Sequence, residues 1–443
     1  MKILIIALAA VIVLGGVLLF ARSSATTVVS SGANNISVSG AAMTSSPALA
    51  PSATGTVAET AAADDESSDC DVPAQPQLAN PPSVVKAVYL TGWSAGSATK
   101  MQSVVNLIKS TELNAVVIDI KDYSGYVSYA MDVPGVKASG AEDEIRIACM
   151  NGVIKELHDN GIYVIGRITD FQDPVLAKAH PEWAMHNKTT GAVWTDSNGL
   201  AWMDPAEQPV RDYLASIAKD AFGRGFDEIN FDYIRFATDG SISNISYPAW
   251  DQKTPRATVI TDYFKFLRST FPTEKISADL FGLTTVSDDD MGIGQVIQGA
   301  YEYFDYVSPM VYPSHYASGF IGYQYPAAYP YQVIAYSLQH ALVKLAAMGD
   351  PVDTQMTPTS SWAQVFALGT VPAAKLRPWL QDFSLGPTGA PGTIYTADMV
   401  RQEMQAVYDT LDTTSSSDHY DGWMLWNAAN NYTAGALGPK SGN

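Results

Sequence analysis

Eight short apolar runs alternate with longer helical segments from Val84 onward, and this alternation constrains the fold more than any other feature. Each run is rich in β-branched and aromatic residues, which is typical of a strand buried on both faces. The expected strands are KAVYLTGW (86–93), NAVVIDIKD (114–122), IYVIGRITD (162–170), EINFDYIRF (228–236), KISADLFG (275–282), YVSPMVY (306–312), KLRPWLQDF (375–383) and GWMLWN (422–427). The expected helices cover 98–110, 142–160, 206–224, 257–270, 331–348 and 396–411. This order predicts an α/β fold, a (β/α)8 TIM barrel with long strand-to-helix loops.

An open, doubly wound parallel sheet is the alternative fold. Such sheets often bind nucleotides through a glycine-rich loop after the first strand. The segment TGWSAGS (91–97) does not have the G-x-G-x-x-G spacing of that loop. The barrel is therefore favoured.

Residues 1–22 are predicted to be a signal peptide or a membrane anchor. Lys2 precedes an apolar run from Ile3 to Phe20, and Arg22 follows it. The run is longer than the apolar part of a typical signal peptide and is close to the length that spans a bilayer. Because Ser23-Ser24-Ala25 is a passable cleavage site, cleavage and anchoring both stay open. Either one predicts an exported protein, secreted or membrane-anchored with an extracytoplasmic domain.

Residues 23–83 are expected to form a flexible linker, and 84–436 to form the barrel domain. The linker consists mainly of Ala, Ser, Thr, Gly and Pro, and it cannot bury enough apolar area to offset the entropy lost on ordering. Cys70 lies in the linker and Cys149 in the expected helix 142–160. The two cysteines could pair in an oxidising compartment, but their positions in the sequence do not establish it.

The charge balance argues against nucleic acid and anionic membrane surfaces as partners of the barrel. The formal net charge is -19, and the chain has no basic run. Phosphate groups need clustered cations. The 6 histidines show neither H-x-H nor H-E-x-x-H spacing, so we expect no zinc site and predict no metal or cofactor.

Polar side chains recur near the carboxyl ends of the expected strands, where a parallel barrel gathers its active site. A charge inside an apolar strand is costly unless it is paired. Taken singly, these residues could form structural ion pairs, such as Asp119 with Lys121 or Asp232 with Arg235. Together they predict one shared site. The set is Asp119, Lys121, Arg167, Asp170, Asn230, Asp232, Arg235, Asp279, Tyr312, Gln381, Asp382, Trp426 and Asn427.

Two of these carboxylates, Asp232 and Asp279, stand on adjacent expected strands and would suffice for glycosidic bond cleavage. One must protonate the leaving oxygen, while the other attacks the anomeric carbon or activates water. Asn230 is expected to orient Asp232, and Arg235 to keep it ionised. The remaining members of the set are expected to bind the substrate.

Aromatic side chains support a carbohydrate ligand, because sugars present apolar C–H faces that stack on aromatic rings. Trp426 is expected to stack on the sugar. One or two tryptophans of the loop 171–205, which contains Trp183, Trp194 and Trp202, are expected to do the same.

Several motifs together resemble a bacterial family of glycosyl hydrolase domains, distantly related to the α-amylase-type and other barrel glycosidases. They are VVIDIKDYSG, IGRITDFQDP, FDEINFDYIRF, ISADLFG, YVSPMVYPSHY, LRPWLQDF and GWMLWNAANNY, and they span about 84–432. The resemblance implies a barrel that cleaves carbohydrate. The α-amylase-type layout implies Asp232 as nucleophile and Asp279 as acid, although the acid there is usually Glu. A chitinase-type mechanism is disfavoured, because its essential Glu would fall at Ile234.

A non-catalytic, carbohydrate-binding barrel at the cell surface is the rival function. It would keep the tryptophans but would tolerate the loss of either Asp232 or Asp279. Both hypotheses predict a polysaccharide or oligosaccharide as the partner.

Overall fold

The computed structural model describes residues 72–350, 362–386 and 389–440. The segment 1–22, the linker up to residue 71 and Cys70 lie outside the described residues. Export, anchoring and a bond between Cys70 and Cys149 therefore stay predictions. Within the described part of the chain, no helix is both long and apolar enough to cross a membrane.

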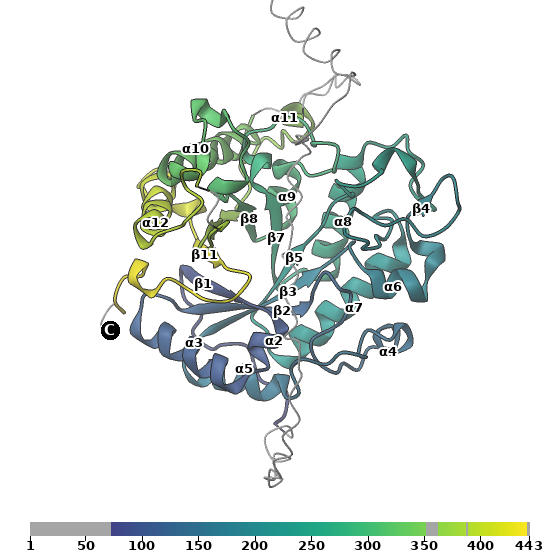
Figure 1. Cartoon of the computed structure of the whole chain (residues 1–443), viewed down its shortest axis with the longest axis horizontal. Helices are drawn as coiled ribbons and strands as arrows, with labels where there is room; N and C mark the ends of the chain where they lie inside the picture. Colours follow the sequence, from purple (N-terminus) through teal and green to yellow (C-terminus); the bar gives the residue numbers. More distant parts are fainter. Residues whose placement is uncertain (1–71, 351–361, 387–388, 441–443) are drawn as a thin grey trace, which may run out of the picture. The chain divides into compact units, whose positions relative to one another are not determined.

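The strands form one closed parallel barrel, which confirms the predicted (β/α)8 fold (Figure 1). They are β1 (Val85–Leu90), β2 (Ala115–Lys121), β3 (Tyr163–Thr169), β5 (Glu228–Asp232), β7 (Lys275–Phe281), β8 (Tyr306–Met310), β9 (Lys375–Leu376), β10 (Trp379–Gln381) and β11 (Gly422–Trp426). The barrel closes because β10 pairs with β11 on one side and with β8 on the other. The expected strand 375–383 is split into β9 and β10 around Pro378, which has no N–H to donate to a neighbouring strand.

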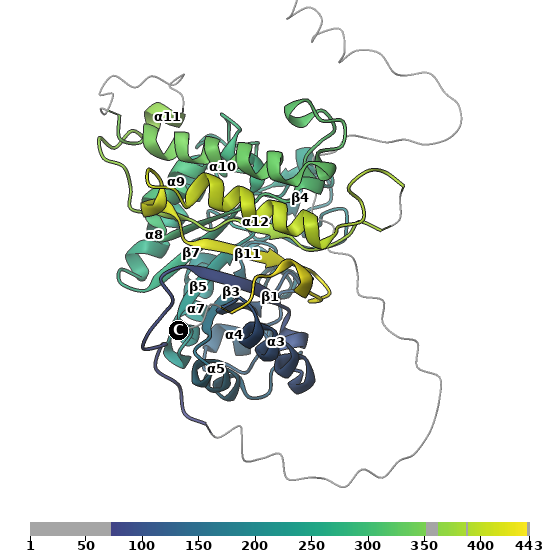
Figure 2. The ribbon, with the colours of Figure 1, turned by 90° about the vertical axis from the view of Figure 1, so that its left-hand side faces the viewer.

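Helices cover the outside of the barrel (Figure 2). The longer ones are α3 (Ala98–Ser110), α5 (Met150–Asp159), α7 (Gln208–Arg224), α8 (Arg256–Thr270), α9 (Ile297–Tyr303), α10 (Pro330–Ala347) and α12 (Ala397–Leu411). Short elements in the loops are α2 (Gly92–Ala95), α4 (Pro134–Ser139), α6 (Pro174–Ala179), α11 (Trp362–Val365), β4 (His186–Asn187) and β6 (Ile245–Ser246). The expected helix 142–160 is confirmed only from Met150 onward, and α9 was not predicted.

Side chains alternate along each strand between the barrel interior and the surrounding helices. On β2, Val117 belongs to the interior apolar cluster, whereas Ile118 and Ile120 belong to the cluster between strands and helices. Asp119 has the same parity as Val117, so its side chain points inward near the carboxyl end of the strand. The same rule brings the polar strand-end residues of β3, β5 and β7 into the barrel.

Residues 72–83 lie against the barrel and do not behave as part of a free linker. Leu78 packs on the interior apolar cluster, and its N–H donates to Asp227 Oδ1 at 2.6 Å. The N–H of Gln75 donates to the carbonyl of Arg224 at 3.0 Å. These bonds anchor the segment at the amino-terminal end of β5, so the barrel unit begins before Val84.

Candidate active site

Arg167 on β3 holds together carboxylates from three neighbouring strands at the carboxyl end of the barrel. Its Nη1 donates to Asp119 Oδ1 at 2.6 Å, and its Nη2 donates to Asp232 Oδ2 at 2.5 Å. Its Nε lies 3.1 Å from Asp232 Oδ2 and 3.9 Å from Asp279 Oδ2. All four side chains are at least 95% buried, with exposures of 1–5%. The strand ends therefore create one buried cluster of three acids and one cation.

Asp279 is held mainly through one of its two carboxyl oxygens. Oδ1 accepts from Asn230 Nδ2 at 2.8 Å and from Trp379 Nε1 at 2.8 Å. Burial raises the pKa of Asp279 well above its usual range, and the nearby charge of Asp232 raises it further, while Arg167 opposes the shift. A carboxyl group of this kind keeps its proton at a pH where an ordinary Asp has lost it.

Asp232 is the last residue of β5, and both of its oxygens accept hydrogen bonds. Oδ2 accepts from Arg167, and Oδ1 accepts from the backbone N–H of Tyr233 at 2.6 Å. Tyr233 has a φ of 54°, a left-handed conformation that is uncommon for a bulky residue. Such strain collects at functional sites, where the surrounding structure maintains it.

Two expectations about Asp232 are wrong. Its cationic partner is Arg167 and not Arg235, whose guanidinium lies 4.7 Å from the ring centroid of Trp202 and 4.8 Å from that of Phe281. Asn230 does not bond Asp232, because its amide bonds Asp279 and, at 3.0 Å, Ser277 Oγ. The alternation of side chains along a strand predicts which of them face the barrel interior. It does not predict which residue of a neighbouring strand each one contacts.

Asp119 is the third acid of the cluster. Its Oδ2 accepts from the hydroxyl of Tyr89 at 2.5 Å. Burial raises the pKa of Asp119 to about 6, against the opposing charge of Arg167. Asp119 and Asp279 therefore both have a pKa above the ordinary range of aspartate.

Aromatic rings frame the cluster. Trp426 stacks on Tyr89 with ring centroids 3.9 Å apart, and the guanidinium of Arg167 lies 5.2 Å from the centroid of Trp426. Trp426 is half-buried at the carboxyl end of β11. The hydroxyl of Tyr312 is buried without a hydrogen-bond partner among the described residues, and its ring lies edge-on to Phe383.

Lys121 and Asp170 do not join the carboxylate cluster directly. A register shift between Asp119 and Lys121 turns the lysine toward Asp173, whose Oδ2 lies 3.0 Å from its ammonium. The suggested pair of Asp119 with Lys121 is therefore wrong. Asp170 accepts from the hydroxyl of Tyr263 at 2.7 Å, and burial raises its pKa well above the usual range.

Three further members of the predicted set are tied into the loops that follow β8, β10 and β11. Gln381 accepts from the backbone N–H of Ser314 at 3.2 Å. Asp382 accepts from the N–H and the hydroxyl of Thr433 at 2.7 and 2.6 Å. Asn427 donates to the carbonyl of Asp382. In the described structure these bonds hold the loops in place.

The loop tryptophans mostly belong to the core. Trp194 and Trp202 are 2% and 1% exposed, and Trp202 donates to Asp196 Oδ2 at 3.0 Å. Neither can stack on a sugar without rearrangement. Trp183 is half-buried and stacks on His180, with centroids 3.8 Å apart.

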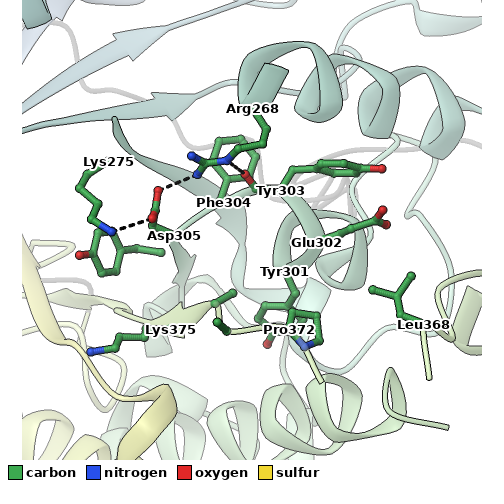
Figure 3. Close-up of a pocket in the computed structure, with 13 residues that line it drawn as sticks. Arg268, Lys275, Tyr301, Glu302, Tyr303, Phe304, Asp305, Leu368, Pro372 and Lys375 are labelled. Carbon is green, nitrogen blue, oxygen red and sulfur yellow. Dashed lines mark hydrogen bonds and ion pairs between the residues drawn. The ribbon is translucent and has the colours of Figure 1, made fainter. Parts of the chain in front are cut away.

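A pocket of about 530 Å³ lies at the opposite end of the barrel, beside the first residues of β7, β8 and β9. Asp305 accepts from Arg268 at 2.6 Å and from Lys275 at 2.9 Å in its wall (Figure 3). Active sites of such barrels lie at the carboxyl ends of the strands, and the amino-terminal end serves stability. We therefore place the candidate site at the Arg167 cluster. In the described part of the chain, no group of three His, Cys, Asp or Glu side chains is arranged to hold a metal ion.

Sequence reasoning missed Tyr89, Trp379, Ser277 and Glu228 as parts of the site and its support. Tyr89 and Trp379 are aromatic, and such residues usually fill a core. For Tyr89 the available signal was its parity, because it shares the inward-facing side of β1 with Val85 and Ala87. The hydrogen bonds of Tyr89 and Trp379 to Asp119 and Asp279 depend on contacts across the barrel.

Comparison with known proteins agrees with the barrel fold. A family model described as "Putative glycosyl hydrolase domain" matches residues 87–432. No curated protein matches the chain. Among solved structures, a hypothetical protein from Ruminiclostridium thermocellum ATCC 27405 is 38% identical, covers 46% of this chain and 98% of its own, and has a TM-score of 0.41.

The glycoside hydrolase domain of PgaB (BpsB) from Bordetella bronchiseptica is 12% identical, with a TM-score of 0.52, over 81% of this chain and 100% of its own. The glycoside hydrolase domain of PelA from Pseudomonas aeruginosa is also 12% identical, with a TM-score of 0.39, over 79% and 97%. At this identity, the likeness to the PgaB domain shows a shared fold. With most of its length matched by the family model, the chain belongs to the glycosyl hydrolase domain family and has its barrel fold.

Proposed function

We propose that the protein is a glycoside hydrolase that cleaves a polysaccharide or oligosaccharide with two carboxylates, Asp279 as general acid and Asp232 as nucleophile or general base. The observation that carries this proposal is the contrast between the two groups beside Arg167. Asp279 is buried with a raised pKa, whereas Asp232 accepts two hydrogen bonds from a guanidinium. Environments that differ in this way suit one carboxyl group to donate a proton and the other to act as an anion.

The proposed reaction uses the groups in a fixed order. The carboxylic acid of Asp279 gives its proton to the glycosidic oxygen as that bond breaks. The carboxylate of Asp232 attacks the anomeric carbon directly or removes a proton from the attacking water. Arg167 supports the negative charge on Asp232, and Trp426 offers a ring face for the sugar.

The test is the release of reducing ends from a panel of polysaccharides. We expect Asp232→Asn and Asp279→Asn to lose activity by at least about a hundredfold, the usual contribution of such groups. Asp262→Asn is the matched control, since this exposed residue of α8 undergoes the same change in charge. Full activity in either active-site variant would refute the assignment. Sugar binding without cleavage by any form would favour the non-catalytic barrel.

The proposal places the enzyme outside the cytoplasm, with support only from the sequence. The apolar run of residues 3–20 is followed by a long Ser/Ala/Thr-rich segment, as expected for an exported or tethered domain. Cell fractionation tests this localisation. Recovery of the full-length chain in the cytoplasmic fraction would refute it, and mass measurement of the mature chain would separate cleavage from anchoring.

A further inference from the structure

A continuous line of hydrogen bonds runs inside the barrel from its amino-terminal half up to Asp279. Nη1 of Arg377 donates to both carboxylate oxygens of Glu228, at 2.9 and 3.0 Å. The hydroxyl of Ser277 donates to Glu228 Oε1 at 2.6 Å, and Asn230 Nδ2 donates to Ser277 Oγ at 3.0 Å. Asn230, Ser277, Glu228 and Arg377 are completely buried, so water does not compete for these bonds.

The chemistry of each group fixes which atom donates and which accepts at every hydrogen bond of this line. Because Glu228 accepts from Arg377 at both oxygens, the single hydroxyl proton of Ser277 points to Glu228. The oxygen of Ser277 can then only accept from Asn230. The amide of Asn230 must therefore turn its NH₂ toward Ser277, and the other proton of that NH₂ faces Asp279 Oδ1 at 2.8 Å.

Asp279 Oδ1 consequently faces two groups that can only donate, the NH₂ of Asn230 and the indole N–H of Trp379. A proton on Oδ1 would face the proton of one of these N–H groups, and two donors cannot form a hydrogen bond with each other. Oδ2 accepts no hydrogen bond from the described residues. It lies 3.9 Å from Arg167 Nε, on the side of the carboxylate cluster. A protonated Asp279 is thus expected to carry its proton on Oδ2.

We propose that Ser277 is a positioning residue that, through the amide of Asn230, assigns the transferable proton of Asp279 to Oδ2, which faces Arg167 and Asp232. This inference rests on the proposed function, because it treats Asp279 as the acid. Ser277 touches neither the substrate nor the reacting atoms. Its role is to keep the NH₂ of Asn230 in place, and Glu228 and Arg377 keep Ser277 in place in turn.

The chain offers a matched control for Ser277. Ser308 is also a fully buried serine of the barrel, and it pairs in register with Asp279 from the next strand, β8. Its hydroxyl has no hydrogen-bond partner within the described structure. Ser308→Ala therefore removes the same atom from an equally buried serine without touching the line of bonds to Asp279.

The test follows the titration of Asp279 in the full-length protein, independently of any substrate. The pH dependence of the unfolding free energy is measured for each serine variant with and without Asp279→Asn, and the difference reports the proton uptake of Asp279. Ser277→Ala frees the amide of Asn230, so the anion of Asp279 loses a donor. We expect the titration to move upward by about one pH unit. Ser308→Ala should leave the pH at which Asp279 titrates unchanged. Ser277→Thr, which keeps the hydroxyl, should titrate at the same pH as the unsubstituted protein.

Equal titration in Ser277→Ala and Ser308→Ala would overturn the proposal. Should Ser277→Ala fail to fold, Asn230→Ala removes the same donor directly, and an unmoved titration in that variant would also overturn it. With a cleavable glycan, the high-pH limb of kcat should shift in the same direction, while KM changes little. A shifted titration in a protein that cleaves no glycan would refute the proposed function but leave the positioning role intact.

Discussion

Arg167 gives two of its N–H groups to a single oxygen of Asp232: Nη2 lies 2.5 Å and Nε 3.1 Å from Oδ2. Both residues are 95% buried, so the ion pair is shielded from water. The pair joins β3 to β5 at the level where both strands end. It leaves the third nitrogen, Nη1, for Asp119. One arginine therefore pairs with two acids of the candidate site, Asp119 and Asp232.

Replacing this arginine should damage both stability and activity. Arg167→Gln leaves Asp119 and Asp232 buried without their cation, which typically costs about 3–5 kcal/mol. We expect a lower urea midpoint and a loss of glycan cleavage. Arg256→Gln is the control, because that half-buried arginine lies 4.9 Å from the ring of Trp250 and has no acidic partner within ion-pair distance among the described residues. Similar urea midpoints for the two variants would contradict the assigned role of Arg167.

Asp170 should make the folded protein less stable as the pH rises. Its folded-state pKa is raised by burial, so its stabilising contribution is complete below about pH 3.9, the unfolded pKa, and is lost as the pH rises through the folded pKa. Its Oδ1 also lacks a hydrogen-bond partner in the described part of the chain. Asp170→Asn should therefore raise the thermal midpoint at pH 8 and bring little gain at pH 4.

Asp204→Asn is the matched control for the Asp170 prediction. Asp204 is equally buried, but its oxygens accept from the backbone N–H groups of Ala206, Ala249 and Trp250. Its replacement should lower the thermal midpoint at both pH values. A gain at pH 8 for Asp204→Asn, or a loss for Asp170→Asn, would contradict the difference in hydrogen bonding between these two carboxylates.

Two glycines in left-handed conformations should differ sharply in their tolerance of alanine. Gly161 has a φ of 68° and open space where a Cβ would lie, so Gly161→Ala should cost about 1 kcal/mol from backbone strain alone. Gly422 has a φ of 85°, and a Cβ there would lie 1.8 Å from the carbonyl oxygen of Val85. Gly422→Ala should cost at least about 2 kcal/mol more, because β11 would have to move away from β1. Urea unfolding of both variants tests this difference. Equal losses of unfolding free energy would contradict the close approach of Gly422 to Val85.

The ion pairs of the barrel interior should matter far more than those on its surface. Arg377 is fully buried and bonds Glu228 and Asp421, so Arg377→Met should cost about 3–5 kcal/mol by leaving buried carboxylates without a cation. Arg401 pairs with Asp398 on the exposed face of α12, and Arg401→Met should change stability by less than about 1 kcal/mol. Comparable losses in the two variants would argue against an ionised Glu228.

Periodicity was enough to predict the strands, the barrel and the depth of the polar residues. Runs of β-branched and aromatic residues reveal buried strands, and a period of two tells which side chains face inward. Asp119, Arg167, Asn230, Asp232 and Asp279 were expected near one another for that reason, and the structure brings them together. The register shift that turns Lys121 toward Asp173 cannot be seen in the alternation of apolar and polar residues. The prediction that Lys121 joins the shared site was wrong for that reason.

What the sequence by itself determined is the order of the elements and the inward side of each strand, because both follow from local patterns of apolar residues. Only the tertiary structure determined which of these side chains contact one another. Arg167 meets Asp232, Asn230 meets Asp279, and Trp379 reaches Asp279 from a strand much later in the chain. These contacts join residues 49 to 100 positions apart. The register between strands and the closure of the barrel set which side chains share a level, and neither is recorded in any single segment of the chain.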